Sequence, residues 1–208
     1  FVGSPQPGIV TGKPVSLGGS ITRRESTGRG AVAVGQAAMQ KIGKNYKDSR
    51  VVIQGFGNVG RYAAIDSYER GAKVIAVNDL GGAVFNKDGL NIPELFKHIA
   101  KNPSVKGFEG GEDYEGEILE IECDVLIPAA VGGVITSSNA EKIKTNVLIE
   151  GANSPTTLNA DKILRENGVM IIPDILANAG GITASYFEWV QNTQNYLWKE
   201  SELHEKLI

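Results

Sequence analysis

The stretch VVIQGFGNVG at positions 51–60 restricts the fold of this chain more than any other segment. A run of apolar and β-favouring residues leads directly into glycines at the spacing G-x-G-x-x-G. At such a position Gly55 permits a tight turn, and Gly57 lets a ligand approach the backbone with no Cβ in between. Gly60 lets the following helix pack close to the sheet. A helical pattern follows, so the context predicts a dinucleotide-binding turn, and a turn that serves packing alone is the alternative.

Short apolar segments alternate with helical patterns along most of the chain. Because such strands are buried on both sides, they predict a parallel sheet covered by helices on both faces. The expected fold is therefore α/β, a three-layer, Rossmann-like, doubly wound sheet. Strands are expected at 51–54, 73–77, 83–85, 124–127, 147–150 and 169–172. Helices are expected at 27–42, 58–70, 93–101, 137–144 (capped by Ser137 or Ser138) and 159–167, and from 182 onward, with a helical pattern again toward 208; residues 102–117 are predicted to form a surface loop.

The domain organisation follows from this pattern. Residues 1–24 are rich in proline and glycine and are expected to be irregular chain. Residues 25–195 carry the alternating elements and are predicted to form one nucleotide-binding domain. Residues 196–208 are expected to begin a further helical segment.

Charge and hydropathy exclude two classes of partner. The chain of 208 residues has 21 basic and 24 acidic side chains, and no basic run stands out. Nucleic acid is therefore not an expected partner. No apolar run approaches the roughly 20 residues that a membrane span needs, so no membrane association is expected.

Cysteine and histidine give no sign of a metal site. The single Cys123 excludes an intramolecular disulfide and a thiolate cluster, and its context IECDVLIP predicts an inert residue in a buried strand. This cysteine usage fits a reducing cytosol and hence a cytoplasmic protein. His98 and His204 lie on helical surface patterns, and we expect neither to have a carboxylate partner at ligand spacing.

The glycine turn also indicates how a dinucleotide would lie. The helix start that follows it offers unpaired amides and a partial positive charge to a pyrophosphate. Asp79 comes 19 residues after Gly60, where a carboxylate can accept hydrogen bonds from the adenosine ribose; Asp-Leu-Gly-Gly is also good turn chemistry. A carboxylate there repels a 2′-phosphate, and residues 80–86 contain no Lys or Arg, so the sequence slightly favours NAD over NADP.

Three further stretches accompany GFGNVG in order along the chain: TGKPVSLGGSITRRESTGRG (11–30), EGANSPTT (150–157) and PDILANAGGITASYFEWVQN (173–192). Together they closely resemble the coenzyme-binding half of glutamate dehydrogenases, over about residues 8–200. Two details depart from that family. Ser154 stands where the family usually has Gly, and Val131-Gly132-Gly133 replaces a Leu-Glu-Asn-like stretch.

The resemblance implies roles for individual residues. Arg23 would bind the substrate α-carboxylate, for which a guanidinium fork is well suited, and Ser185 would contact the side-chain carboxylate. Thr27 would contact the nicotinamide carboxamide. The remaining cofactor contacts would be Gly55, Phe56, Gly57, Asn58, Val59, Gly60, Asp79, Asn153 and Asn178. Each polar residue also has a plainer interpretation, as a solvated charge, a helix cap, a turn residue or an exposed serine.

The resemblance also implies the reaction of an intact enzyme, NAD(P)-dependent oxidative deamination of L-glutamate to 2-oxoglutarate and ammonia in a homo-oligomer, commonly a hexamer. The family's catalytic Lys and Asp belong to an N-terminal domain that precedes the stretch matching Phe1. We therefore expect no catalytic residue and no turnover in this chain alone. Two alternatives remain. A leucine, phenylalanine or valine dehydrogenase would differ at Ser185, and a non-catalytic nucleotide-sensing module would share the fold.

Overall fold

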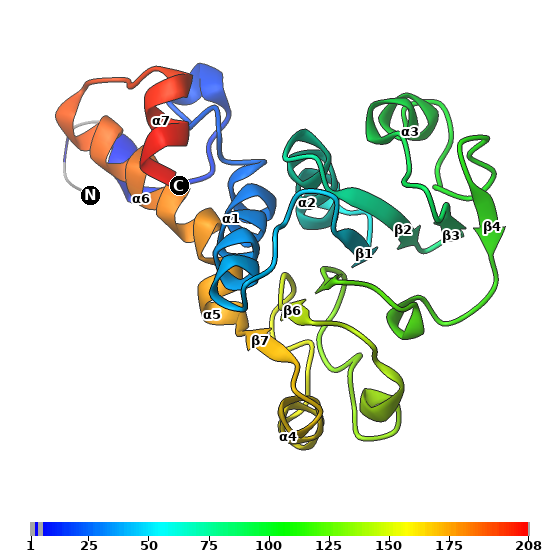
Figure 1. The fold of residues 1–208 in the computed structure, drawn as a ribbon. Coiled ribbons are helices and arrows are strands. Elements are labelled where there is room, and N and C mark those ends of the chain that lie inside the picture. Colours follow the sequence, from blue (N-terminus) through cyan, green and yellow to red (C-terminus); the bar gives the residue numbers. More distant parts are fainter. Residues whose placement is uncertain (1–2, 4–5, 208) are drawn as a thin grey trace.

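The computed structural model describes residues 3 and 6–207. Its centre is one seven-stranded sheet in the order β4-β3-β2-β1-β5-β6-β7 (Figure 1). Strands β2, β1, β5, β6 and β7 run parallel to one another, while β3 and β4 add an antiparallel edge. The strands are β1 (Arg50–Gln54), β2 (Lys73–Asp79), β3 (Gly82–Phe85), β4 (Glu112–Tyr114), β5 (Val125–Pro128), β6 (Val147–Ile149) and β7 (Met170–Ile172).

Two apolar cores, one on each face, make the molecule three layers thick. The first core packs Val51, Ile53 and their neighbours against helices α1, α2 and α3, and the second packs Val52, Leu126 and Leu148 against α4. The predicted doubly wound α/β fold is thus confirmed. The helices are α1 (Ser26–Lys41), α2 (Asn58–Glu69), α3 (Ile92–Ile99), α4 (Leu158–Glu166), α5 (Asp174–Ala177), α6 (Ala179–Gln194) and α7 (Glu200–Leu207), with 3₁₀ turns at Pro7–Ile9, Val15–Leu17, Ile118–Glu120 and Ala140–Lys142.

The strand order reverses between β1 and β5. From β1 the chain moves outward through β2, β3 and β4, and it then returns to the other side of β1 as β5. The loops that follow β1 and β5 therefore diverge, and they leave a crevice at the carboxyl ends of these strands. Ligands bind at such switch points in open α/β sheets.

Glycines set how closely three helices approach one another. A Cβ at Gly28 of α1 would lie 2.6 Å from the backbone of α2, and a Cβ at Gly180 of α6 would lie 2.1 Å from the Ser26 carbonyl oxygen. Only glycine permits these backbone contacts. They bring the first turn of α1 against the starts of α2 and α6, beside the crevice.

The structure corrects two expectations about elements. Residues 112–114, placed in a loop from their polar composition, form the edge strand β4, which pairs with β3. The helix expected at 137–144 is reduced to the 3₁₀ turn Ala140–Lys142, and neither Ser137 nor Ser138 caps it. Asn139 bonds instead to the backbone that precedes it. Its Oδ1 accepts a hydrogen bond from Thr136 N and its Nδ2 donates one to Val134 O, and this holds the segment in a turn.

Within the described part of the chain, every helix is too short or too polar to span a membrane. Cys123 is buried beside β5, as predicted, and burial raises the pKa of its thiol to about 12. The thiol therefore stays protonated at neutral pH.

Candidate coenzyme and substrate site

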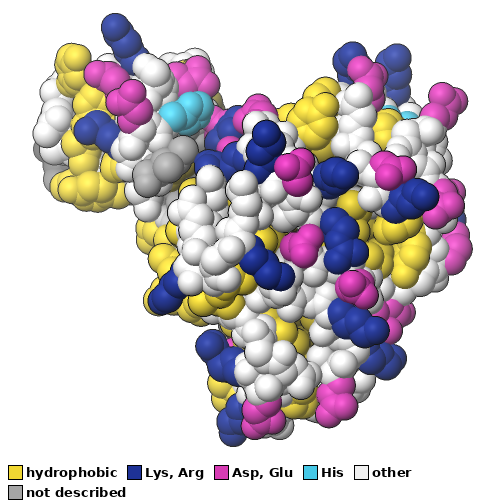
Figure 2. Space-filling view, viewed as in Figure 1, with side chains coloured by type: hydrophobic (Ala, Val, Ile, Leu, Met, Phe, Trp, Pro, Cys, Tyr) yellow, Lys and Arg dark blue, Asp and Glu magenta, His cyan; other side chains and the backbone are white. Residues whose placement is uncertain are grey.

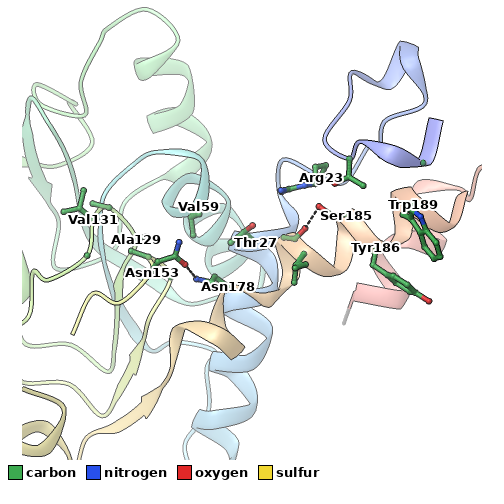
Figure 3. Close-up of a pocket in the computed structure, with 18 of the residues that line it drawn as sticks. Arg23, Thr27, Val59, Ala129, Val131, Asn153, Asn178, Ser185, Tyr186 and Trp189 are labelled. Carbon is green, nitrogen blue, oxygen red and sulfur yellow. Dashed lines mark hydrogen bonds between the residues drawn. The ribbon is translucent and has the colours of Figure 1, made fainter. Parts of the chain in front are cut away.

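A cavity of about 1060 Å³ opens at the switch point (Figure 3). Its walls come from six parts of the chain: the N-terminal segment, the starts of α1 and α2, the loops after β5 and β6, and α6. It is lined by six of the predicted site residues, namely Arg23, Thr27, Val59, Asn153, Asn178 and Ser185. The fold thus brings together side chains that are up to 162 positions apart in the sequence.

The glycine turn has the geometry expected of a phosphate-binding turn. Gly55 has φ +94°, and a Cβ at Gly60 would lie 1.8 Å from the Gly55 carbonyl oxygen, so both positions require glycine. At Gly57 a Cβ would meet nothing within 4 Å, which leaves open space above the backbone. No side chain caps α2 at Gly57. The first amides of α2 are therefore free to bind an anion.

The other residues of the turn have different surroundings. The Phe56 ring is buried and packs edge-on against Phe96, so this residue could contact a cofactor only through its backbone. Asn58 donates a hydrogen bond from Nδ2 to Arg24 O at 2.8 Å, and this links the turn to the segment before α1. Gly57 and Asn58 line a neighbouring cavity of about 390 Å³ together with Arg24 and Arg61.

Arg23 has a buried donor with no partner. Its Nε is inaccessible to solvent and makes no hydrogen bond to any described residue. Such a group costs free energy unless something binds it. Gly181 makes room for it, because a Cβ at that position would lie 2.4 Å from Thr27 Oγ1 and 3.5 Å from Arg23 Nη1. Because Arg23 also lines the cavity, its guanidinium is a candidate for binding an anionic group there.

Asn153 and Asn178 contact each other across the cavity. Asn178 donates from Nδ2 to Asn153 Oδ1 at 2.7 Å, whereas Ser185 Oγ donates to Gly181 O at 3.2 Å in its own helix (Figure 3). The loop that carries Asn153 is fixed by its neighbour Ser154, which has φ +46° and donates its amide to Asp174 Oδ2. The serine that replaces the family's usual glycine thus keeps a left-handed conformation.

Asp79 is held by its own chain. Its carboxylate accepts hydrogen bonds from Gly81 N, Ser104 Oγ and Val105 N at 2.7–2.8 Å. The predicted turn role is therefore present, and ribose binding by the same carboxylate stays a prediction. Lys106 packs over Gly82 and pairs with Glu115, so a basic residue lies beside this turn although none occurs at 80–86.

Sequence reasoning missed Glu188, which lies one turn beyond Ser185 on α6. Its carboxylate is fully buried and accepts hydrogen bonds from Lys13 Nζ at 2.6 Å and from the amides of Gly12, Lys13 and Ser20. Burial raises the pKa of Glu188, but these hydrogen bonds outweigh it and the pKa is lowered overall. Glu188 thereby fixes the N-terminal segment, whose Gly8, Ile9 and Thr11 form one wall of the cavity.

Comparison with known proteins shows the family of the chain. The sequence family described as glutamate/leucine/phenylalanine/valine dehydrogenase matches residues 18–208. The chain belongs to this dehydrogenase family. It is 47% identical to a glutamate dehydrogenase of Thermotoga maritima over 208 residues, which are 99% of this chain and 50% of that protein.

Solved dehydrogenase structures share the fold. The hetero-hexameric glutamate dehydrogenase of Thermus thermophilus, in a leucine-bound form, has a TM-score of 0.90 at 32% identity over 97% of this chain and 48% of its own. The glutamate dehydrogenase of Peptoniphilus asaccharolyticus has a TM-score of 0.82 at 36% identity, over 96% of this chain and 47% of its own. The chain spans about half the length of these relatives and corresponds to the coenzyme-binding domain of a glutamate dehydrogenase-like protein.

Proposed function

We propose that this chain binds the coenzyme, and one side of the substrate, of an NAD(P)-dependent L-glutamate dehydrogenase. The observation that carries the proposal is the common cavity. It joins the start of α2 to Arg23, Thr27 and Ser185, which would face the nicotinamide and the substrate. The buried, unpartnered Nε of Arg23 supports a carboxylate in this place.

The cavity orients reactants and does not transfer protons. Among the described residues that line it, none is Lys, His, Asp or Glu. A bound NAD(P) would supply the hydride acceptor for oxidation at the substrate Cα. Arg23 and Ser185 would hold the two carboxylates of glutamate, and Thr27, Asn153 and Asn178 would fix the nicotinamide. Orientation of this kind can lower a barrier by several kcal/mol, whereas the proton-transfer groups would come from the other half of the enzyme.

The exposed apolar side chains at the cavity support a second domain that covers them in the intact enzyme. Ile182, Tyr186 and Trp189 project from α6 with 75%, 59% and 46% exposure, and the two aromatic rings stack on each other. Covering them would remove apolar surface from water. We propose that the substrate domain of an intact, cytoplasmic, hexameric enzyme closes over this face, and that Asp79 makes NAD the preferred coenzyme.

The test is a titration of the purified chain with NADH and NADPH, followed by tryptophan and nicotinamide fluorescence, with and without 2-oxoglutarate. We expect saturable NADH binding that 2-oxoglutarate strengthens. Arg23→Gln should remove the effect of 2-oxoglutarate. Arg165→Gln is the matched control, because Arg165 is exposed and, among the residues that the structure describes, bonds only to Asp161.

Each outcome bears on a separate part of the proposal. No saturable binding of either nucleotide would contradict the coenzyme role. If 2-oxoglutarate still strengthens NADH binding in Arg23→Gln, the substrate role of Arg23 is contradicted. Glutamate-dependent reduction of NAD by the chain alone would contradict the absence of proton-transfer groups.

A further inference from the structure

Three potential metal ligands meet where α7 lies against the start of α1, apart from the coenzyme cavity. Glu200 and His204 are one turn apart on α7, and Glu25 immediately precedes α1. One ligand atom from each of the three residues lies within 4.8 Å of the others. His204 Nε2 is 2.7 Å from Glu25 Oε1. The expectation that His204 has no carboxylate partner is therefore wrong.

The cluster is partly sheltered and well oriented. The side chains of Glu25 and His204 are 14% and 33% exposed, whereas Glu200 is exposed. Arg29 Nε donates to Glu25 Oε2 at 2.8 Å, which turns Oε1 toward His204. Outer hydrogen bonds of this kind orient the ligands of metal sites. Figure 2 shows acidic side chains on the surface over α7.

The charge around the cluster favours a cation. Arg29 also bonds to Asp66 and Glu69, and Arg70 bonds to Asp66. The two arginines pair with the carboxylates of Glu25, Asp66 and Glu69, and Glu200 adds a fourth carboxylate beside Glu25. The network has a net charge of −2 when His204 is neutral. A divalent ion would balance this charge. The charge of Arg29, the arginine that bonds to Glu25, is already balanced by its carboxylate partners.

We propose that Glu25, Glu200 and His204 form a binding site for a divalent transition-metal ion of the zinc type. One imidazole nitrogen and two carboxylate oxygens suit Zn²⁺, which commonly takes three protein ligands and keeps one position for water. Mg²⁺ prefers a shell made of oxygen alone. The bound ion would fasten α7 to the first turn of α1, which carries Thr27.

Glu200 separates this proposal from a simple ion pair. The bond between His204 and Glu25 does not need Glu200, which makes no hydrogen bond or ion pair to another described side chain. If the cluster is only an ion pair, replacing Glu200 should change nothing. If it binds metal, Glu200→Gln should weaken metal binding while the metal-free protein keeps its stability.

The experiment is a calorimetric titration of the metal-free chain with Zn²⁺, repeated with Mg²⁺, together with thermal melts of each variant. The chain has only two histidines and one buried cysteine, so background sites are few. His98→Gln is the matched control, because His98 lies on α3 and contacts the backbone of Ser104 and Lys106.

We expect one equivalent of Zn²⁺ to bind and to raise the melting temperature. Mg²⁺ should not compete with this binding. His204→Gln and Glu200→Gln should each weaken binding by about tenfold or more, whereas His98→Gln should bind as the wild type does. Absence of Zn²⁺ binding, or binding that survives both α7 substitutions, would overturn the proposal. Because no nucleotide is present, this result is independent of the coenzyme role.

Discussion

Glu188 gives the most quantitative prediction. The carboxylate is fully buried, and Lys13, its ion-pair partner, is 15% exposed. Glu188→Gln keeps the shape of the side chain and removes its charge. The substitution leaves the ammonium group of Lys13 without a counter-ion and weakens the bonds to the amides of Gly12, Lys13 and Ser20.

The size of the effect follows from this burial. Breaking a buried ion pair by removing one partner costs about 3–5 kcal/mol. The contacts of Glu188 fasten only residues 12–20 to α6, so the cost falls first on local opening of this segment. A cost of about 3 kcal/mol corresponds to roughly a hundredfold rise in the open population, since 1.4 kcal/mol is a factor of ten.

The assay is native-state amide hydrogen exchange. In Glu188→Gln the amides of Gly12 and Ser20 should exchange about a hundredfold faster, while the amide of Val52 in the central strand should not change. Glu69→Gln is the control, because it removes an exposed carboxylate that bonds to Arg29. Unchanged exchange at Gly12 and Ser20 would refute the reasoning.

The same contact predicts a pH dependence. The pKa of Glu188 is lowered in the folded protein from its ordinary value of 4.5. A carboxylate with a lowered pKa stabilises the fold above its unfolded pKa, and this contribution is lost as the pH falls through the folded value. Exchange at Gly12 should therefore show constant protection from neutral pH to about pH 5, and the protection should decline below pH 4.5. In Glu188→Gln this decline should be missing.

Three further predictions concern single residues. Gly57→Ala should leave the melting temperature unchanged and weaken NADH binding. Gly60→Ala should lower the melting temperature, because its Cβ would meet the Gly55 carbonyl oxygen. Equal melting temperatures of the two variants would contradict this. Ser154→Gly should stabilise the chain by about 1 kcal/mol in urea unfolding, since Ser154 has φ +46°; a loss of stability would count against it. Cys123 should not react with a disulfide reagent at pH 8 until urea unfolds the chain, because its pKa is raised to about 12; rapid labelling of the native chain would show the opposite.

The sequence predicted the sheet and the glycine turn well, because both depend on local patterns. The apolar strands are short and continuous. Gly55 is required by its φ of +94°, and Gly60 by its close approach to the carbonyl oxygen of Gly55, five positions earlier. Strand β4 was missed because Glu112–Tyr114 is polar and lies at the edge of the sheet, where one side faces solvent. Such a strand lacks the apolar signal of a buried one.

Contacts between distant segments could not be predicted from spacing. The pairs Glu188 with Lys13 and His204 with Glu25 join residues 175 and 179 positions apart. Two of the three candidate metal ligands, Glu200 and His204, have the spacing of one helical turn, although the two were not paired from the sequence. The sequence alone does not say which of the adjacent Arg23 and Arg24 faces a ligand. The fold places Arg23 at the main cavity and Arg24 at the smaller one.

The central claim is that a dinucleotide binds across the start of α2 at the switch point. Amide chemical shifts of the labelled chain, followed during a titration with NADH, test this most directly. We expect saturable shifts at Asn58, Val59 and Asn178. Leu164 on α4, which packs in the core on the other face, should change little. Unchanged shifts at Asn58 and Val59 under saturating NADH would contradict it.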